Sequence, residues 1–151
     1  MIDRIKAFFS DAGKESLSKG DQDQVAAAAL LVTAARLDSN FAEAERRRIE
    51  QLVAERFGLN ATETAELIAM AETEAAQSSQ LFGFTRVIMA KFDSAQRLEL
   101  LAMLWEVIYA DGRVDDLEAA LMRRLVGLLG VSDRDSGEAR KRVRRKMGLA
   151  G

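Results

Sequence analysis

The sequence predicts an all-α protein, a compact bundle of about seven or eight helices that contains two repeated helix–loop–helix units. The 151 residues include no proline, and apolar residues recur at helical spacing among abundant Ala, Leu, Glu and Arg. No stretch alternates polar and apolar residues over the length of a strand. The longest apolar run, residues 26–35, is too short to span a membrane and predicts a buried helix. With 48% apolar content, residues 1–151 are expected to form a single domain.

Capping boxes mark the expected helix starts. In this motif a short polar side chain caps the first turn, and the side chain three residues later bonds back to the cap's own amide. The candidates are Asp21/Gln24, Asn60/Glu63, Asp93/Gln96, Asp115/Glu118 and, with a shorter acid, Ser132/Asp135. Together with the apolar spacing they predict helices at about residues 2–12, 21–37, 42–57, 61–76, 80–91, 94–110, 116–129 and 133–147.

Glycines and aromatic residues refine this pattern. Gly58 and Gly130 are expected to end helices in the left-handed conformation, with the apolar residue after each packing back on the last turn. The helix at 94–110 is apolar on more than one side, which predicts that it is the central helix. Trp105 and Tyr109 lie on one face of it, so we expect core packing and a hydrogen-bond partner for the Tyr109 hydroxyl.

Residues 1–20 are expected to form an amino-terminal helix and linker. Four apolar residues lie on one side of this helix: Ile2, Ile5, Phe8 and Phe9. Such a stripe usually covers a core, so we expect it to dock on its own bundle or on a second copy, giving a homodimer. Contact with a partner or a membrane surface is the alternative. Charged residues interrupt the segment, which is unlike a signal peptide, and the expected location is the cytoplasm.

An internal repeat relates two acidic loops. Three pairs of residues correspond at a constant offset of 73: Asp38 with Asp111, Phe41 with Val114, and Glu45 with Glu118. Each loop follows an apolar helix and leads into a second helix that ends near a glycine. We therefore expect two helix–loop–helix units packed face to face.

The residues of this repeat resemble a known family. The segment 104–118, LWEVIYADGRVDDLE, with the apolar helix after it, resembles the TerB family of tellurite-resistance and related proteins, and residues 31–59 look like its other copy. The resemblance covers about residues 22–135. It implies an all-α bundle, an association with tellurite and other chemical stress, and binding of divalent cations by acidic residues. Ser39–Asn40 and Arg113 depart from the family pattern, and both changes lower the local negative charge.

Five carboxylates are candidate metal ligands: Asp38, Glu45, Asp111, Asp115 and Glu118. An all-oxygen site of this kind would suit Ca²⁺ or Mg²⁺. A structural interpretation stands beside this one, because negative charge is favoured at a helix amino end and Asp115/Glu118 is itself a capping box. The spacing also differs from that of an EF-hand calcium loop.

The missing residue types exclude several classes of chemistry. The chain has no cysteine and no histidine, which rules out disulfides, thiolate or imidazole metal sites, and catalysis by Ser-His-Asp or Cys-His. No glycine-rich nucleotide loop is present, and no catalytic or cofactor-binding residue is assigned. We expect a protein that is not an enzyme. The alternative is a metal-dependent hydrolase, which would need the carboxylates of both loops close together and facing a pocket.

Charge is distributed unevenly. The net charge is −2, but residues 138–151 carry +5 and the rest about −7. Residues 136–151 are expected to form a basic carboxy-terminal helix or tail, with these candidate partner-binding residues: Arg140, Lys141, Arg142, Arg144, Arg145 and Lys146. No aromatic residue accompanies them, so specific nucleic-acid binding is not expected. An accessory role on nucleic acid or an anionic membrane surface remains an alternative.

These observations favour one function among the alternatives. The sequence indicates a TerB-like, non-enzymatic module in a cytoplasmic stress response to tellurite or metal. Such a module would act by protein contacts, with weak divalent-cation binding as a further property.

Overall fold

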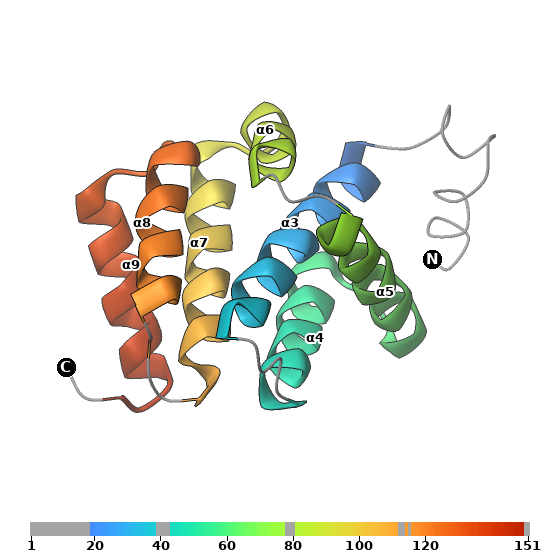
Figure 1. Ribbon diagram of the computed structural model, residues 1–151, viewed down its shortest axis with the longest axis horizontal. Helices are drawn as coiled ribbons and strands as arrows, with labels where there is room; N and C mark the ends of the chain where they lie inside the picture. The colour runs from blue at the N-terminus through green and yellow to red at the C-terminus, as the bar shows by residue number, and fades with distance from the viewer. Residues whose placement is uncertain (1–18, 39–42, 78–80, 112–113, 115, 150–151) are drawn as a thin grey trace.

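The computed structural model describes residues 19–38, 43–77, 81–111, 114 and 116–149 (Figure 1). These residues form seven α-helices and two 3₁₀ turns, with no strand among them, which confirms the all-α prediction. The elements are α3 (Lys19–Ala35), η1 (Arg36–Asp38), α4 (Glu43–Phe57), α5 (Ala61–Gln77), α6 (Leu81–Lys91), α7 (Ser94–Ile108), η2 (Tyr109–Asp111), α8 (Asp116–Leu128) and α9 (Asp133–Lys146). No helix in this part of the chain is long and apolar enough to cross a membrane. The predicted helix at 2–12 lies outside the described residues.

Local capping chemistry sets the starts of three helices, α5, α7 and α9. Asn60 caps α5 in a full capping box, in which the Glu63 amide donates to Asn60 Oδ1 (2.8 Å) and Glu63 Oε1 accepts from the Asn60 amide (3.0 Å). Asp93 caps α7 in the same way. At α9 the Asp135 amide donates to Ser132 Oγ at 3.1 Å, the first half of the predicted box.

The predicted cap at Asp21 is wrong. The helix α3 already includes Lys19 and Gly20, so Asp21 lies inside its first turn and cannot cap it. The Asp115 cap lies outside the described residues. The other end of α3 also differs from the prediction, because its last turn tightens into the 3₁₀ turn η1. The helix α7 ends likewise in η2, so the two units keep the same helix–3₁₀ order before their acidic loops.

Gly58 and Gly130 end α4 and α8 in the left-handed conformation, with φ of 65° and 66°. The amide of the next residue reaches back into the last turn in both cases, from Leu59 to Ala54 O (3.0 Å) and from Val131 to Val126 O (3.1 Å). Both predicted helix ends are therefore confirmed, since this is the bond pattern that a left-handed cap creates.

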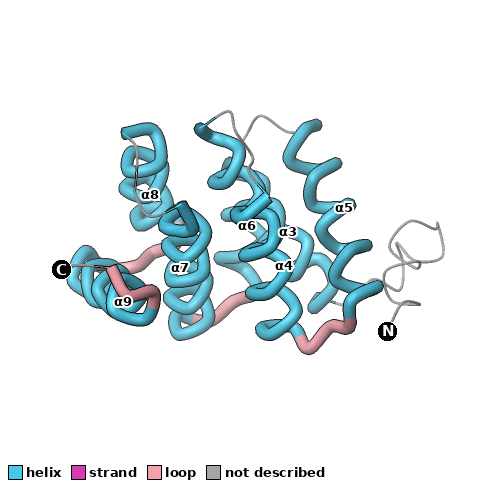
Figure 2. The backbone as a smooth tube through the Cα atoms, turned by 90° about the horizontal axis from the view of Figure 1, so that it is seen from below, coloured by secondary structure: helices cyan, strands magenta, loops and turns pink. Residues whose placement is uncertain are grey.

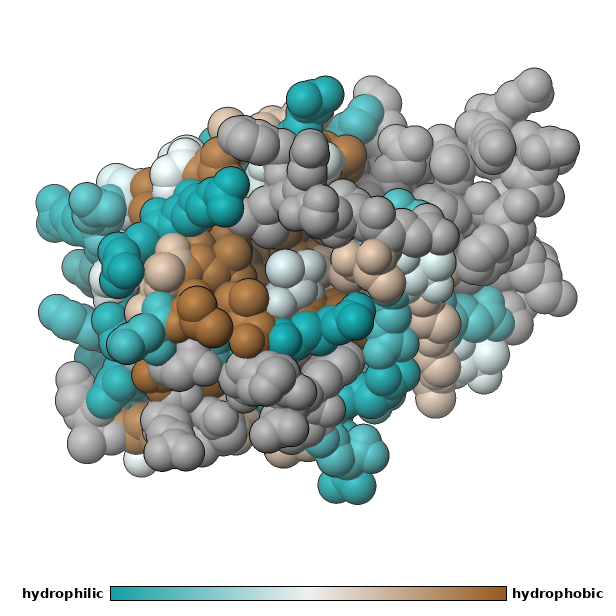
Figure 3. All heavy atoms as spheres, viewed as in Figure 1, coloured by the Kyte–Doolittle hydropathy of each residue, from teal (hydrophilic) through white to brown (hydrophobic). Residues whose placement is uncertain are grey.

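Two helices form the centre of the bundle. The helix α3 packs against α4, α5, α6 and α7, and nearly all of its residues 25–35 are buried (Figures 1 and 2). Its many alanines allow close approach of neighbouring backbones. The predicted central helix, α7, is buried from Leu100 to Ile108 except at Ala102, and it packs on α3, α4 and α9. The centre is thus shared between α3 and α7. On the face shown in Figure 3, apolar side chains gather near the middle, bordered by hydrophilic ones.

The pair Arg46–Glu72 joins α4 to α5. Arg46 donates from Nη1 to Glu72 Oε2 (2.6 Å) and from Nη2 to Oε1 (3.2 Å), a bidentate geometry. The hydrogen bond to Glu72 raises the pKa of Arg46 above its ordinary value, while partial burial opposes the shift. The pair with Glu72 therefore favours the charged form of the guanidinium.

The two repeated units interlock. Their first helices, α3 and α7, pack on each other. The turn η1 of the first unit lies against α8 of the second, and η2 of the second lies against α4 of the first. Each unit thus places the turn before its acidic loop beside the outgoing helix of the other.

Candidate functional site

Glu45 and Glu118 are the carboxylates that the interlocking units bury. Each is the third residue of its helix, α4 or α8, and each is only 1% exposed. Asp38 and Asp111 end the turns η1 and η2, which lie against α8 and α4. The fold therefore places the turn that ends in each predicted aspartate against the helix that carries the glutamate of the other unit.

Part of the predicted metal site lies outside the described residues. The side chains of Asp38 and Asp111, and all of Asp115, lie outside the described residues. Among the described side chains, no three acidic groups come together as a metal site. The five-residue metal assignment therefore stays a prediction.

Glu63 shows how a buried glutamate can arise from capping alone. It is also the third residue of its helix, α5, and is 4% exposed while it bonds to the amide of Asn60. The sequence predicts the same box for Asp115 and Glu118, and Asp115 lies outside the described residues. Glu45 differs, because the residue three places before it is Ala42, which has no side-chain oxygen to complete the box.

The basic helix α9 is docked on α7 and is not a free tail. Its buried residues are Ser136, Ala139 and Val143. The six candidate partner-binding residues divide into two sets. Arg140, Arg144 and Lys146 contact side chains of the body, and the others, Lys141, Arg142 and Arg145, are exposed.

Tyr109 anchors α9 through its hydroxyl. Arg140 Nε donates to Tyr109 Oη at 2.6 Å, and Arg144 Nη1 donates to it at 3.1 Å. The Tyr109 ring stacks on Trp105 with centroids 5.7 Å apart, and the Arg140 guanidinium lies 4.9 Å above the Trp105 ring. The predicted core packing and hydroxyl partner are both confirmed. The aromatic residues that these arginines contact lie on α7 and at the start of η2, far from α9 in the sequence.

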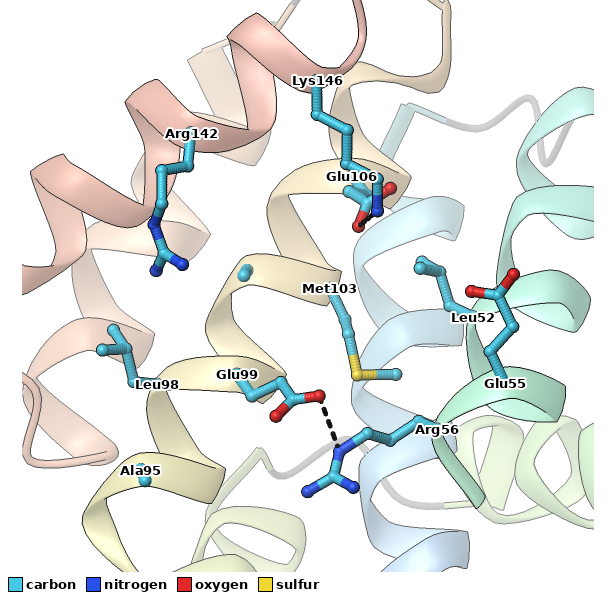
Figure 4. A pocket seen from close by; sticks show the side chains of 11 residues that line it. Leu52, Glu55, Arg56, Ala95, Leu98, Glu99, Met103, Glu106, Arg142 and Lys146 are labelled. Carbon is cyan, nitrogen blue, oxygen red and sulfur yellow. Dashed lines mark hydrogen bonds and ion pairs between the residues drawn. The ribbon is translucent and has the colours of Figure 1, made fainter. Parts of the chain in front are cut away.

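A cleft of about 570 Å³ lies between α4, α7 and α9 (Figure 4). Its lining from α7 is largely apolar and includes Leu98, Ala102 and Met103. The α4 side supplies Leu52, Glu55 and Arg56, and the α9 side supplies Arg142 and Lys146. Such a mixture of apolar floor and charged rim is typical of binding sites.

Two glutamates of α7 form ion pairs with cations on the α4 and α9 sides of the cleft. Glu99 and Glu106 are seven residues apart, about two helical turns, so both lie on the face of α7 that lines the cleft. Glu99 pairs with Arg56 Nε at 3.0 Å, and Glu106 pairs with Lys146 Nζ at 3.2 Å. Arg48 adds a longer contact to Glu106, at 3.9 Å. The carboxylates that line this part of α7 are therefore already matched by cations.

Arg142 differs from these cations. Its guanidinium points into the cleft, and the described residues give it no ion pair (Figure 4). Sequence reasoning assigned it to the basic helix but did not find the cleft, Arg56, Glu99 or Glu106. One signal was available, because Glu106 interrupts an otherwise apolar run at 104–108.

A family model described as "Tellurite resistance protein TerB" matches residues 24–141. This match spans well over half of the chain and includes both interlocked units. The chain belongs to the TerB family. The search of curated proteins and that of solved structures each gave no match.

The family match covers the acidic turns of the repeat but only part of the residues that line the cleft. Both acidic turns and α7 lie inside the matched residues, and the predicted family resemblance is confirmed. The match ends at residue 141, inside α9, so Arg142 and Lys146 lie beyond it. The basic wall of the cleft is thus not part of what the family match covers.

Proposed function

We propose that this TerB chain is a non-enzymatic module of a cytoplasmic response to tellurite or metal stress, and that it binds a protein partner in the cleft of Figure 4. The cleft itself carries this proposal. It joins an apolar floor to a charged rim, the composition expected where an amphipathic segment docks on a helical surface.

Charge indicates what kind of segment fits. Glu99 and Glu106 are matched by Arg56 and Lys146, which leaves Arg142 as the cation turned toward an incoming group. An acidic side chain of the partner would pair with Arg142, while an apolar neighbour would contact Met103 and Leu98. The partner segment is therefore amphipathic and carries at least one carboxylate.

The absence of enzymatic activity is part of the proposal. The competing hydrolase would need the repeat carboxylates to face a pocket and hold a metal-bound water. Neither Glu45 nor Glu118 lines the cleft, and of the glutamates that do line it, Glu99 and Glu106 are engaged in ion pairs. These observations favour a binding role over hydrolysis at the cleft.

Affinity capture from native lysate tests the proposal with a matched pair of variants. Arg142→Glu reverses the charge that points into the cleft, whereas Lys141→Glu reverses an exposed neighbour on the same helix that does not line it. We expect a protein captured by the wild-type chain and by Lys141→Glu but lost with Arg142→Glu. Equal capture by all three chains, or no specific capture, would contradict the proposal.

A second candidate function is the binding of a divalent cation between the interlocked units. It is supported by the burial of Glu45 and Glu118 beside the turns of the opposite unit, and by the lack of a capping oxygen at Ala42. Oxygen donors of this kind suit Ca²⁺ or Mg²⁺.

Calorimetric and melting titrations of metal-free protein test this candidate. A cation that binds only the folded chain raises its melting temperature as its concentration rises. We expect Ca²⁺, Mg²⁺ or Mn²⁺ to do so in the wild type and in Glu43→Gln, an exposed control in the same helical turn, but less in Glu45→Gln or Glu118→Gln. No heat and no melting shift at millimolar metal would exclude the cation. Repeating the capture with chelator then shows whether partner binding depends on it.

A further inference from the structure

The helix α6 occupies a site in the bundle that has an open counterpart. It packs on α3 of the first unit and lies against α8 of the second (Figure 1). Exchanging the two repeated units turns α3 into α7 and α8 into α4, because α3 and α7 lead into the acidic loops and α4 and α8 follow them. The helices α7 and α4 form two walls of the cleft of Figure 4. The cleft is therefore the counterpart, on the second unit, of the site that α6 fills on the first.

Burial shows that α7 lacks a cover that α3 has. The offset of 73 that relates the acidic loops also relates η1 to η2, residue for residue. At this offset Ala29 of α3 corresponds to Ala102 of α7, and Ala26 corresponds to Glu99. Ala29 is 0% exposed and Ala26 is 4% exposed, whereas Ala102 is partly exposed and the Glu99 side chain is 54% exposed. Both α7 residues line the cleft, so this face of α7 is open where the matching face of α3 is buried.

The order of helices along the chain indicates which segment belongs in the cleft. The helix α6 precedes α7 directly, with two residues between them. Its counterpart would precede α3, where the sequence predicts a helix at residues 2–12. That segment lies outside the described residues. Both α3 and α7 begin at the upper end of the molecule in Figure 1, and the connection to α3, residues 13–18, is longer than that between α6 and α7.

Residues 2–12 also have the composition that suits the cleft. One side of the predicted helix is apolar, with residues at helical spacing that match an apolar floor: Ile2, Ile5 and Phe9. The segment carries two carboxylates, Asp3 and Asp11. Arg142 points into the cleft and has no ion pair with a described residue, so it is available to such a group (Figure 4).

We infer that residues 2–12 of this chain occupy the cleft in the free protein, as α6 occupies its site on α3. The regulatory consequence rests on the proposed function. A partner that binds in the cleft has to displace this segment first, so the chain inhibits its own binding site. A cleft that is filled for about 90% of the time binds its partner about tenfold more weakly.

Nitroxide broadening of amide NMR signals tests the contact in the full chain. The sequence has no cysteine, so Ser10→Cys provides a single attachment point in the segment. We expect the label to broaden amides of α7 and α9 that line the cleft and to leave those of α5 sharp. No broadening at the cleft, or broadening that is equally strong on α5, would overturn the inference.

Two substitutions in the labelled chain form a matched pair. Phe9→Asp places a charge in the apolar stripe, whereas Ala7→Asp places the same charge on the polar side of the predicted helix. We expect Phe9→Asp to lose the broadening and Ala7→Asp to keep it, and equal broadening in both would contradict docking by the apolar side. Nitroxide-labelled chains are also mixed with isotope-labelled chains that carry no nitroxide. Broadening in this mixture would assign the segment to a second copy and overturn its assignment to the same chain.

Affinity capture from lysate then tests the regulation. We expect Phe9→Asp to capture several-fold more of the partner than the wild type, and Ala7→Asp to capture the same amount as the wild type. Unchanged capture by Phe9→Asp would overturn the inhibition. The broadening is measured on purified chain without a partner, so the two claims fail separately. Broadening without any capture contradicts only the proposed function, and capture without broadening contradicts only the occupation of the cleft by residues 2–12.

Discussion

Glu45 and Glu118 occupy the same position in two helices of the repeat, and each is 99% buried by the fold. Exposed acids, Glu43 and Asp116, precede them by two residues in the same first turns. Removing a buried carboxylate leaves its surroundings without a partner, which costs about 2 kcal/mol. We expect Glu45→Ala and Glu118→Ala each to lower the free energy of unfolding by about that amount in urea denaturation. Glu43→Ala and Asp116→Ala should change it by less than about 0.5 kcal/mol. Equal small effects at all four positions would contradict a structural role for the buried pair.

Tyr109→Phe tests the docking of α9. The change removes the acceptor of two arginine hydrogen bonds while it keeps the ring that stacks on Trp105. We expect a loss of about 1–2 kcal/mol in stability and faster amide exchange confined to α9. Thr73→Val, which removes an exposed hydroxyl on α5, is the control and should leave α9 unchanged. Unaltered exchange in α9 of the Tyr109 variant would show that these bonds do not hold the helix.

Asp93→Ala tests whether capping chemistry sets the start of α7. The substitution removes the oxygen that accepts from the Gln96 amide at 2.8 Å. We expect a destabilisation of about 1 kcal/mol, measured by thermal unfolding. Asp133→Ala, at the first residue of α9 but not at its cap, should cost clearly less.

Two glycines of the α8 region should respond to alanine with opposite signs. Gly130 has φ of 66°, where a side chain is strained, so Gly130→Ala is expected to destabilise the chain by about 1 kcal/mol. Gly127 lies in helical backbone with no atom within 4 Å of an added Cβ. Gly127→Ala should therefore stabilise the chain by up to about 1 kcal/mol. Denaturation midpoints measured on both variants check the two signs, and a shift in the same direction would contradict them.

Local signals predicted most of the fold. The caps at Asn60 and Asp93 and the glycines at 58 and 130 act within a few residues, so the sequence shows them directly. Asp21 failed as a cap because an acid followed by Gln is not by itself a helix start, and α3 continues through Lys19 and Gly20. The repeat was visible, since its residues correspond at a fixed offset.

The candidate sites could not be predicted in the same way. The cleft depends on the angle at which α4 and α9 pack on α7, and no residue spacing encodes that angle. Six cations lie close together in the sequence of α9. Tertiary packing decides that Arg140 bonds to Tyr109 and that Lys146 pairs with Glu106. Sequence reasoning therefore found the basic helix but not the division of its residues between anchors and exposed cations.

Occupation of the cleft by a protein is tested most directly by photocrosslinking in living cells. A benzophenone amino acid at Ala95, an exposed position that lines the cleft, would report contacts there, and the same group at Ala76, exposed on α5, is the control. We expect one discrete adduct from position 95, lost when Arg142→Glu is added, and none from position 76. No adduct at position 95, or the same adduct from both positions, would contradict partner binding in the cleft.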